Sequence, residues 1–512
     1  MLLIISGQYV ESELRAEFGK IPPTFLPLGN QRLYTHQIAQ VSRSYGSVVL
    51  TLPSDFHLED ADGNAMARLG VRVIRTAVGQ TLGGAVQEAL GQVDASDRID
   101  ILYGDTLVFE DELGGTDWIA VGNSDEFYPW HYEASPEDAE NEEAWAGMFS
   151  FSNADALRRL LRESGDFIQT VTRYGREYKS LERRSLKRWL DFGHVHTYFH
   201  SRLAMTTQRH FNRLNVVEGV LTKSSDDVRK MCAEATWFET APQAIRPFLP
   251  NLICGESAEH GAYSIEYLPL TSLSELYVFG RLPVKVWKKV MAACNRYLCA
   301  ERGVPVAGAG DSELTRRTYL DKTLVRLEAF SRQTGVDIHK AWQFNGSALP
   351  SLSEMTQQAY AAVSARPPVP SFVHGDLCFS NILYDFRADR IKVIDPRGLD
   401  ASGRITSFGD FRYDMAKLAH SVLGLYDAIV AGRFELMVDD HDVRFDVSCQ
   451  SWESVQRAFK GTSFAGRTPD AWDCEPIMVL LFLSMLPLHA DQPRRQTALM
   501  ANCMRIFQEW RA

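Results

Sequence analysis

The strongest indication of a fold comes from the first two hundred residues, where two kinds of apolar pattern alternate. Short runs typical of buried strands are separated by segments whose apolar residues recur at helical spacing. The strand-like runs lie at residues 2–5, 47–52, 72–74, 99–103 and 118–121. Because strands that alternate with helices form βαβ units, the pattern predicts a parallel, doubly wound α/β sheet.

The pattern changes after the segment WLDFGHVHTYFHSRLAM, which ends at residue 205. Two strand-like segments follow at 211–217 and 219–223, and a helical pattern begins near Asp226. Long helical segments make up much of the rest. A chain of 512 residues is too long for one hydrophobic core. We therefore predict an α/β domain over residues 1–205 and an α+β domain over residues 206–512.

The charge of the chain argues against a nucleic-acid partner. Its net charge is −11 and no basic run appears, whereas binding to phosphate backbones requires clustered Lys and Arg. The start, MLLIISGQYVESE, lacks the basic residues and the length of a secretory signal. The apolar segment at 477–488 is shorter than the roughly 20 residues of a membrane span, so we predict a core helix there. We expect small-molecule partners and no membrane contact. A homo-oligomer is a further possibility.

Cysteine and histidine spacing gives no indication of a structural metal site. All eight Cys residues lie at or after Cys232 without a C-x-x-C pair, which predicts neither a disulfide framework nor a zinc site. A reducing cytoplasm is the location that we expect. In HVHTYFH, His194, His196 and His200 lack Cys or carboxylate partners at ligand spacing, so we interpret this segment as the start of a helix.

The segment HGDLCFSNILYDFRADRIKVIDPRG carries the clearest chemical pattern in the C-terminal half. Its two apolar runs predict a short hairpin, with Asp376 and Asn381 before it and Asp395 after it. A loop carboxylate can accept a substrate hydroxyl proton while an Asn and a strand-end Asp hold Mg²⁺ against nucleotide phosphates. This set therefore indicates phosphoryl transfer from ATP.

The same segment resembles the signature of the aminoglycoside phosphotransferase and choline kinase superfamily, H-G-D-x-x-x-x-N followed by a strand and I-D. The resemblance covers residues 374–395 and implies a protein-kinase-like fold over the C-terminal domain. It implies Asp376 as catalytic base and Asn381 and Asp395 as metal ligands. We expect Arg397 to contact the acceptor. His374 is interpreted as a brace of the loop, and Asp414 as a support from a helix.

The segment GVLTKSSDDVRKMCAEATWF resembles the nucleotide-clamping part of the same superfamily. It predicts a strand that ends in Lys223 and a helix, capped by Ser225 or Asp226, that carries Glu234. Lys230 is the alternative to Lys223, but its position within the helical pattern favours a surface location. In YSIEYLPLTSLSEL, the backbone from Glu266 to Leu268 is expected to contact adenine. NVVEGV is the weak candidate for a phosphate loop.

Two strand ends in the N-terminal half predict a second ligand site. LIISGQ places Ser6 and Gly7 after the first strand, and ILYGDTL places Asp105 after another. In open α/β sheets, ligands bind outside the carboxyl ends of the strands. Since Mg²⁺ prefers oxygen ligands and substrate phosphates, Asp105 is a candidate ligand for a nucleotide-bound metal.

These segments resemble the sugar-phosphate nucleotidyltransferases, which have a Rossmann-like fold. LPLGNQRLYTHQI corresponds to the region that follows their phosphate loop. VGQTLGGAVQEAL resembles their nucleobase segment and implies Gln80 and Gly84 as base contacts. WLDFGHVHTYFHSR resembles their W-x-D-[IVFT]-G-T segment and implies Asp191 as the second metal ligand. WAGMFSFSNADAL implies that Gly147 lines the pocket of the phosphorylated substrate.

The N-terminal half also departs from that family. SGQYVESELR stands where the family has the phosphate loop G-x-G-T-R, and Thr24 stands where its K-P-L-L-P segment has Lys. Either Arg15 and Lys20 neutralise the triphosphate instead, or this half is catalytically inactive.

Together the two resemblances imply consecutive steps on one chain, with Mg²⁺, ATP and a second NTP. The C-terminal half would phosphorylate a sugar, polyol or amino alcohol, and the N-terminal half would couple the phosphate to CTP or UTP. The product would be an activated precursor for surface polysaccharide. The alternative is a kinase whose N-terminal half only binds a nucleotide or product and regulates.

Overall fold

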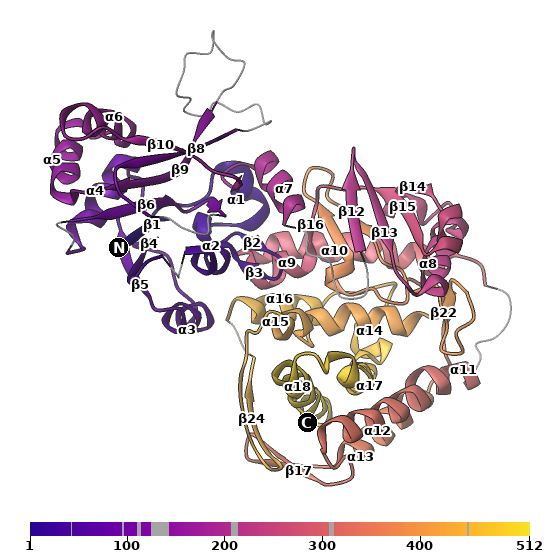
Figure 1. Cartoon of the computed structure of the whole chain (residues 1–512). Coiled ribbons are helices and arrows are strands. Elements are labelled where there is room, and N and C mark those ends of the chain that lie inside the picture. Colours follow the sequence, from indigo (N-terminus) through magenta and orange to yellow (C-terminus); the bar gives the residue numbers. More distant parts are fainter. Residues whose placement is uncertain are drawn as a thin grey trace. The chain divides into compact units, whose positions relative to one another are not determined.

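The computed structural model describes residues 1–41, 44–94, 97–109, 114–123, 143–205, 213–306, 312–447 and 450–512 (Figure 1). Contacts between Cα atoms divide the chain into two compact units. Unit 1 is Met1–Thr206 with Phe279–Arg281, and unit 2 is Thr207–Val278 with Leu282–Ala512. The boundary expected near residue 206 and most of the acidic segment at 133–145 lie outside the described residues.

A seven-stranded sheet forms the centre of unit 1. Its order is β10-β8-β9-β6-β1-β4-β5, with β1 (Leu2–Ile5), β4 (Val48–Pro53), β5 (Val71–Thr76), β6 (Ile99–Tyr103), β8 (Trp118–Asn123), β9 (Glu143–Phe151) and β10 (Glu182–Ser185). The five predicted strands are confirmed, and β1 runs parallel to β4 and β6. The sheet is parallel over β6, β1, β4 and β5, as predicted, but β9 pairs antiparallel with both β6 and β8. Antiparallel pairing is common between strands that are neighbours both in the described order and in the sheet, as β8 and β9 are.

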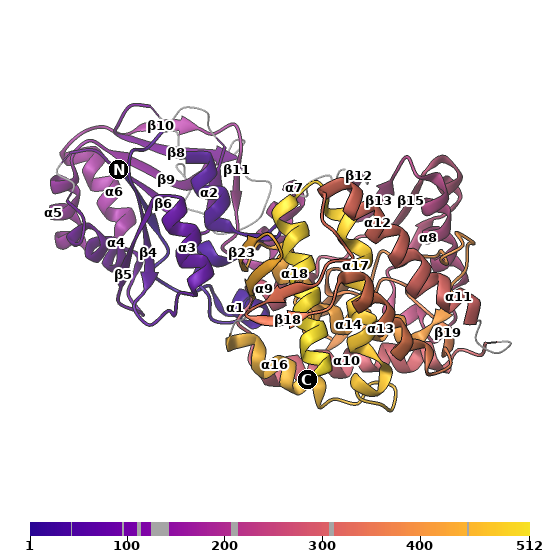
Figure 2. The ribbon, with the colours of Figure 1, turned by 90° about the horizontal axis from the view of Figure 1, so that it is seen from below.

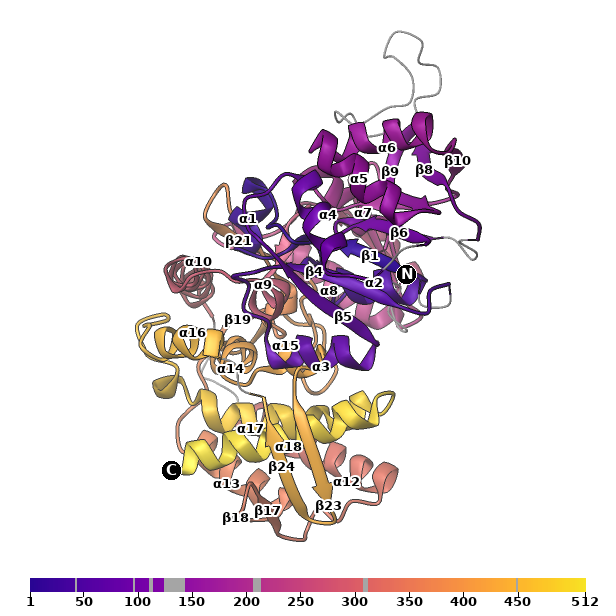
Figure 3. The same ribbon diagram turned by 90° about the vertical axis from the view of Figure 1, so that its left-hand side faces the viewer.

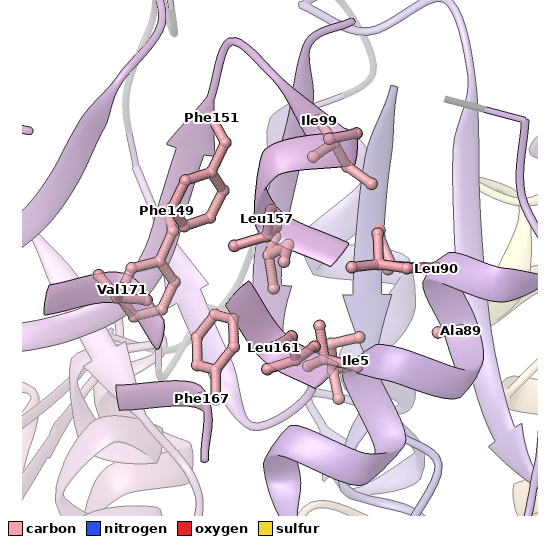
Figure 4. Close-up of a cluster of buried hydrophobic side chains, with 14 of the residues drawn as sticks. Ile5, Ala89, Leu90, Ile99, Phe149, Phe151, Leu157, Leu161, Phe167 and Val171 are labelled. Atoms are coloured by element: carbon pink, nitrogen blue, oxygen red, sulfur yellow. The ribbon is translucent and has the colours of Figure 1, made fainter. Parts of the chain in front are cut away.

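Helices cover both faces of this sheet. A hydrophobic cluster joins the strands to α4 (Leu82–Gly91), α5 (Ala154–Ser164) and α6 (Phe167–Glu177), through residues such as Leu90, Leu157 and Val171 (Figure 4). Figure 2 shows α2 (Leu33–Val41) and α3 (Asp60–Arg68) on the other side of the strands. Burial of large apolar side chains on both faces holds the strand ends in fixed positions.

Two short antiparallel pairs form separate two-stranded sheets in unit 1. β7 (Thr106–Val108) follows β6 after a turn and pairs with β11 (Trp189–Asp191), so that Asp191 lies opposite Thr106. The remaining elements of this unit are α1 (Ser12–Phe18), the 3₁₀ turn Pro23–Phe25, the pair β2 (Pro27–Leu28) and β3 (Gln31–Arg32), and α7 (Val195–Ala204).

Unit 2 begins with a four-stranded antiparallel sheet in the order β12-β13-β15-β14. The strands are β12 (Arg213–Val217), β13 (Val220–Ser224), β14 (Leu252–Cys254) and β15 (Ala262–Glu266), and α8 (Val228–Thr240) packs near β15. The cap predicted for α8 was Ser225 or Asp226. The cap is Asp227, whose carboxylate accepts the backbone N–H of Lys230.

Helices make up most of the rest of unit 2. Figures 1 and 3 show α17 (Cys474–Met485) between α14 (Phe411–Val422) on one side and α12 (Lys322–Thr334) and α13 (Leu352–Ser364) on the other. Because α17 is buried along its length, the prediction of a core helix there is confirmed. Within the described ranges, no helix is long and apolar enough to cross a membrane.

The predicted hairpin forms from β20 (Ile382–Asp385) and β21 (Arg390–Val393), and β16 (Thr271–Ser272) pairs with β20. The further strands of this unit are β17 (Trp342–Phe344), β18 (Ser347–Leu349), β19 (Pro370–Phe372), β22 (Phe408–Asp410), β23 (Glu435–Asp439) and β24 (Asp442–Asp446). The further helices include α10 (Val284–Gly303), α11 (Ser312–Arg316), α15 (Tyr426–Val430), α16 (Gln450–Lys460) and α18 (Pro493–Arg511), and α9 is Leu273–Phe279.

Candidate active sites

The loop after β19 is fixed by the buried side chain of His374. Its Nε2 lies 3.0 Å from the carbonyl oxygen of Ile394, and its Nδ1 accepts the backbone N–H of Asp376 at 3.2 Å. These partners require a neutral ring with the proton on Nε2. Burial lowers the pKa of His374 to about 4, which agrees with a neutral ring. His374 therefore has the contacts of a brace for the loop.

Asp414 holds the same loop from α14. Its carboxylate accepts the backbone N–H groups of His374 at 2.6 Å and Gly375 at 2.9 Å. Burial raises the pKa of Asp414 to about 7, although both hydrogen bonds act in the opposite direction. Because both N–H groups are held, the backbone that leads to Asp376 has a fixed orientation. Asp414 therefore helps to orient the side chain of Asp376.

Asp376 contacts a lysine that the sequence analysis did not identify. Its Oδ1 lies 2.7 Å from Nζ of Lys417, and its Oδ2 lies 3.3 Å from Nδ2 of Asn381. Burial alone would raise the pKa of Asp376, but the charges of Lys417 and Arg397 lower it well below its usual value. The only signal for Lys417 is its position three residues after Asp414, on the same face of α14.

The expected nucleotide clamp joins β13 and α8 to Asp395, which follows the hairpin. Nζ of Lys223 lies 2.6 Å from Oε2 of Glu234 and 3.1 Å from Oδ1 of Asp395. Glu234 also accepts the hydroxyl of Tyr263 at 2.8 Å. The alternative, Lys230, lies 3.8 Å from Glu234, and its side chain is 40% exposed compared with 3% for Lys223. The geometry therefore favours Lys223.

Asn381 and Asp395 lie at the same end of the hairpin, one before β20 and the other after β21. The backbone N–H of Ile394 bonds to the carbonyl of Asn381 at 3.0 Å, which brings the two chain segments together. Nδ2 of Asn381 donates to the carbonyl of Asp376, so its Oδ1 is the atom that suits a cation. An amide oxygen beside a carboxylate fits Mg²⁺ with nucleotide phosphates.

The turn expected to bind the nucleotide phosphates is not a glycine-rich loop. β12 and β13 are joined by a two-residue turn, Glu218 and Gly219, both with positive φ. So short a turn cannot enclose phosphates as a longer glycine-rich loop does. Glu266 ends β15, and its N–H bonds to the carbonyl of Asn251, while Leu268 accepts the N–H of Leu270. The contact of Glu266 and Leu268 with adenine stays a prediction.

A cavity of about 820 Å³ opens beside Asp376 and is the candidate site for the acceptor. Its wall includes the loop 373–376, Arg397 and side chains of α12, α14 and α17. Nη2 of Arg397 lies 2.8 Å from the hydroxyl of Tyr413. Arg397 also lies against the loop, because a Cβ added to Gly375 would stand 2.8 Å from its Cβ. This volume is ordinary for a metabolite site.

In unit 1, Asp105 and Asp191 come together at the pairing of β7 with β11. The N–H of Phe192 bonds to the carbonyl of Asp105 at 2.8 Å. A Cβ added to Gly193 would stand 2.8 Å from Oδ2 of Asp105 and 3.5 Å from Oδ1 of Asp191, so Gly193 touches both carboxylates. Thr197 Oγ1 and the N–H of Gly193 donate to Asp191. The two predicted ligands therefore share one location.

Burial raises the pKa of both carboxyl groups, and the charge of Asp105 adds to the increase at Asp191. A divalent cation would relieve this repulsion, so the pair fits the Mg²⁺ that the resemblance implies. No group of three or more His, Cys, Asp or Glu in the described part of the chain is arranged to hold a metal ion. Substrate oxygens would have to complete the coordination. His194 caps α7, as expected for a helix start.

The end of β1 is held by hydroxyl groups, and one of them belongs to Thr24, at the position where the resemblance would imply Lys. The N–H of Ser6 bonds to Thr51 Oγ1 at 2.7 Å, and Ser6 Oγ lies 2.9 Å from Oγ1 of the buried Thr24. A Cβ on Gly7 would stand 1.9 Å from Thr76 Oγ1, so only glycine fits there. This backbone can approach a ligand closely.

Two cations, Arg15 and Lys20, are expected to neutralise the triphosphate in place of the phosphate loop. Their surroundings differ. Lys20 pairs with Asp55 at 2.6 Å, and Tyr9 donates to the same carboxylate. Lys20 is therefore already neutralised, so it would have to leave Asp55 to bind a triphosphate. Arg15 is exposed on α1.

The other predicted contacts of unit 1 lie near helix α4 and β9. Gln80 precedes the cap Thr81, and its Nε2 donates to Glu88 at 2.9 Å, while the N–H of Gly84 donates to Thr81. Gly147 has φ 71° in β9, and an added Cβ would stand 2.7 Å from Thr106 Oγ1. Gly147 thus lies beside the residue that follows Asp105.

Comparison with known proteins identifies part of the chain. Residues 219–435 match the model of a family described as the phosphotransferase enzyme family. This match confirms the predicted resemblance for most of the region that carries Lys223, Asp376 and Asp395. A comparison with curated proteins found no significant match.

Solved structures of both predicted classes are similar to the chain. A nucleoside-diphosphate-sugar pyrophosphorylase from Vibrio cholerae RC9 is 14% identical with a TM-score of 0.32, over 40% of this chain and 99% of its own. CTP:phosphocholine cytidylyltransferase from Streptococcus pneumoniae is 11% identical with a TM-score of 0.31, over 40% and 98%. A choline/ethanolamine kinase family protein from Mesorhizobium loti is 12% identical with a TM-score of 0.35, over 58% and 86%.

Proposed function

We propose that the chain phosphorylates a hydroxyl group of a small molecule with ATP and then joins the product to a second nucleotide. The match of residues 219–435 to the model of the phosphotransferase enzyme family supports the first step. One observation supports this proposal above all: each unit brings together a pair of oxygen-bearing side chains that could hold a metal ion. Unit 2 has Asn381 and Asp395 beside the Lys223–Glu234 pair, and unit 1 has Asp105 beside Asp191.

In the first step, Lys223 would bind nucleotide phosphates, held in place by Glu234. Asn381 and Asp395 would hold Mg²⁺, which supplies positive charge to the phosphoryl group as it moves. Asp376 would accept a hydrogen bond from the acceptor hydroxyl and orient it toward the γ-phosphorus. Since the phosphoryl transition state is loose, orientation and charge matter more than a strongly basic carboxylate.

Lys417 has a role in this step that follows from its contact with Asp376. Its ammonium group, 2.7 Å from the carboxylate, keeps Asp376 ionised and limits its rotation. The proton of the hydroxyl would pass to Asp376 late in the transfer, and the γ-phosphorus would leave ADP and bond to the acceptor oxygen.

In the second step, Asp105 and Asp191 would hold Mg²⁺ against the triphosphate of an NTP. An oxygen of the new phosphate would bond to the α-phosphorus, and the bond from this phosphorus to pyrophosphate would break. CTP or UTP is the nucleotide that we propose. The product would be an activated precursor for surface polysaccharide, made in the cytoplasm.

The second candidate is a kinase whose unit 1 binds a nucleotide or product without turnover. The pairing of Lys20 with Asp55 and the buried Thr24 favour this alternative, since neither supplies free positive charge for a triphosphate. Release of pyrophosphate distinguishes the two candidates, because only the bifunctional chain produces it.

The test supplies the full chain with ATP, Mg²⁺ and a panel of sugars, polyols and amino alcohols, together with CTP, UTP, GTP or dTTP. Mass spectrometry then detects phosphorylated acceptors and nucleotide-linked products. The Asp376→Asn variant should form neither. The Asp191→Ala variant should form the phosphorylated acceptor alone.

A further inference from the structure

The wall of the cavity beside Asp376 has an excess of positively charged side chains that a ligand could contact. Five Lys and Arg side chains line it, and one of them, Arg404, pairs with Asp400. We call the other four the cation cluster: Lys322 and Arg326 of α12, Arg397, and Lys417 of α14. Lys417 belongs to the mechanism, since it pairs with Asp376. The charge of Arg397 also helps to lower the pKa of Asp376, whereas Lys322 and Arg326 have no role in the proposed transfer of the phosphoryl group.

Every carboxylate in the described wall of the cavity already has a cationic partner. Asp376 pairs with Lys417 at 2.7 Å, and Asp400 pairs with Arg404 at 3.0 Å. Asp410 pairs with Arg412 at 2.8 Å. These acids therefore do not neutralise the rest of the cation cluster.

Lys322, Arg326 and Arg397 form no ion pair with a carboxylate of the described residues. Arg326 donates to the carbonyl of Ser484 at 3.0 Å, and Arg397 donates to the hydroxyl of Tyr413 at 2.8 Å. Nζ of Lys322 lies 5.3 Å from the centre of the Tyr413 ring, and Cζ of Arg397 lies 4.8 Å from it. Two of the three charges thus flank one ring at the wall of the cavity.

The charges of the cluster affect the groups between them. Burial, together with the charges of Arg397, Arg326 and Lys417, lowers the pKa of Lys322 to about 8, while Tyr413 acts in the opposite direction. Burial would raise the pKa of Tyr413, but Arg397, Lys322 and Lys417 lower it to about 7. Both pKa values are lowered, as expected at a site of positive potential, where a bound anion would be stabilised.

We propose that the acceptor carries a phosphate or carboxylate group, which binds to Lys322, Arg326 and Arg397 while its hydroxyl lies at Asp376. The proposal rests on the kinase function proposed above and names the class of acceptor: an anionic sugar or polyol derivative. Guanidinium and ammonium groups converging on one cavity are the usual partners of both anions. A cationic amino alcohol would face three positive charges without a neutralising acid.

The first test compares acceptors that differ only in charge. The full chain with ATP and Mg²⁺ receives glycerol, glycerate and glycerol 3-phosphate, then glucose, glucuronate and glucose 6-phosphate, with choline and an aminoglycoside as cations. We expect kcat/KM for at least one anion to exceed that of its neutral parent by tenfold or more. The phosphate and carboxylate members show which anion is bound. Preference for a neutral or cationic acceptor overturns the proposal.

The second test removes charge from the site. Lys322→Met and Arg326→Met should each raise KM for the anionic acceptor about tenfold, leave KM for ATP unchanged, and reduce the preference over the neutral parent. Lys322→Arg should restore most of the affinity. The control is Arg332→Met on the same helix, where the side chain is 72% exposed and lies next to Glu328. Equal effects of the control and the cavity variants would contradict the proposal.

A third measurement separates this inference from the kinase function itself. Inorganic phosphate is titrated by calorimetry onto chain saturated with Mg²⁺ and a non-hydrolysable ATP analogue, so that the nucleotide site is filled. Binding that weakens in Lys322→Met but not in Arg332→Met supports the anion site, even if no acceptor is phosphorylated and the proposed function fails. Phosphate binding that is absent, or that is independent of Lys322, overturns the anion site. Efficient phosphorylation of choline would retain the kinase and reject the inference.

Discussion

At the scale of single residues, position in the fold separates lysines that look equivalent in the sequence. Lys223 and Lys230 lie seven positions apart and both approach Glu234. Only Lys223 is buried and also reaches Asp395. Burial of a charged pair is costly unless it is fully partnered, so loss of one partner has large effects.

Lys223→Ala should raise KM for ATP by about tenfold or more, because a charge-assisted contact to the phosphates is lost. Lys230→Ala is the matched control and should stay within about twofold of the unmodified chain, since an exposed ion pair contributes little. Steady-state kinetics of ADP release measure both. The assignment of the clamp is wrong if Lys230→Ala proves the more damaging change.

Lys322 gives the acceptor site a dependence on pH. A lysine with a pKa of about 8 is charged below that pH and loses its charge above it. Since the pH profile of kcat/KM reports groups of the free enzyme, kcat/KM for an anionic acceptor should fall as pH rises through 8. The fall should be weaker in Lys322→Met, where Tyr413, with a pKa of about 7, still gains negative charge, and it should persist in Tyr413→Phe. A profile that is identical in all three chains would refute the role of Lys322.

At the scale of elements, the sequence predicted those strands and helices that the local spacing of apolar residues determines. The strands of unit 1, the hairpin around Asp395 and the buried helix α17 each carry a clear periodicity. The antiparallel direction of β9 was missed, because strand direction depends on pairing partners far apart in the sequence. Lys322 and Lys417 were missed because their helices meet the loop only in the folded chain, and no fixed spacing links them to Asp376.

The link between α14 and the loop can be tested at Asp414. In Asp414→Asn, the amide has only one accepting oxygen for the two N–H groups of His374 and Gly375. We expect a loss of about 1–3 kcal/mol in the free energy of unfolding. We also expect a fall in kcat of about tenfold, as Asp376 loses its fixed orientation. Denaturant unfolding and ADP release measure the two effects.

Asp442→Asn on the exposed hairpin of β23 and β24 is the control for this change. It should alter neither quantity. A stable Asp414→Asn chain with unchanged kcat would show that the loop does not depend on α14.

At the scale of the whole molecule, each unit has its own carboxylates, and this separation predicts independent loss of function. Asp105→Ala or Asp191→Ala should stop pyrophosphate release while ADP formation continues, so that the phosphorylated acceptor accumulates. Asp376→Asn should stop ADP formation, yet added phosphorylated acceptor should still give pyrophosphate. Loss of ADP formation in the Asp105 or Asp191 variants would argue against separate sites.

The most direct measurement of the central claim is the stoichiometry of the unmodified chain. ATP, Mg²⁺, an accepted acceptor and each of CTP, UTP, GTP and dTTP are supplied, and ADP and pyrophosphate are quantified over the same reaction. Consecutive kinase and nucleotidyl transfer predict, with one of these nucleotides, one pyrophosphate for each ADP once the intermediate reaches steady state. Formation of ADP and phosphorylated acceptor with no pyrophosphate from any of the four nucleotides would contradict the account and leave unit 1 as a binding domain.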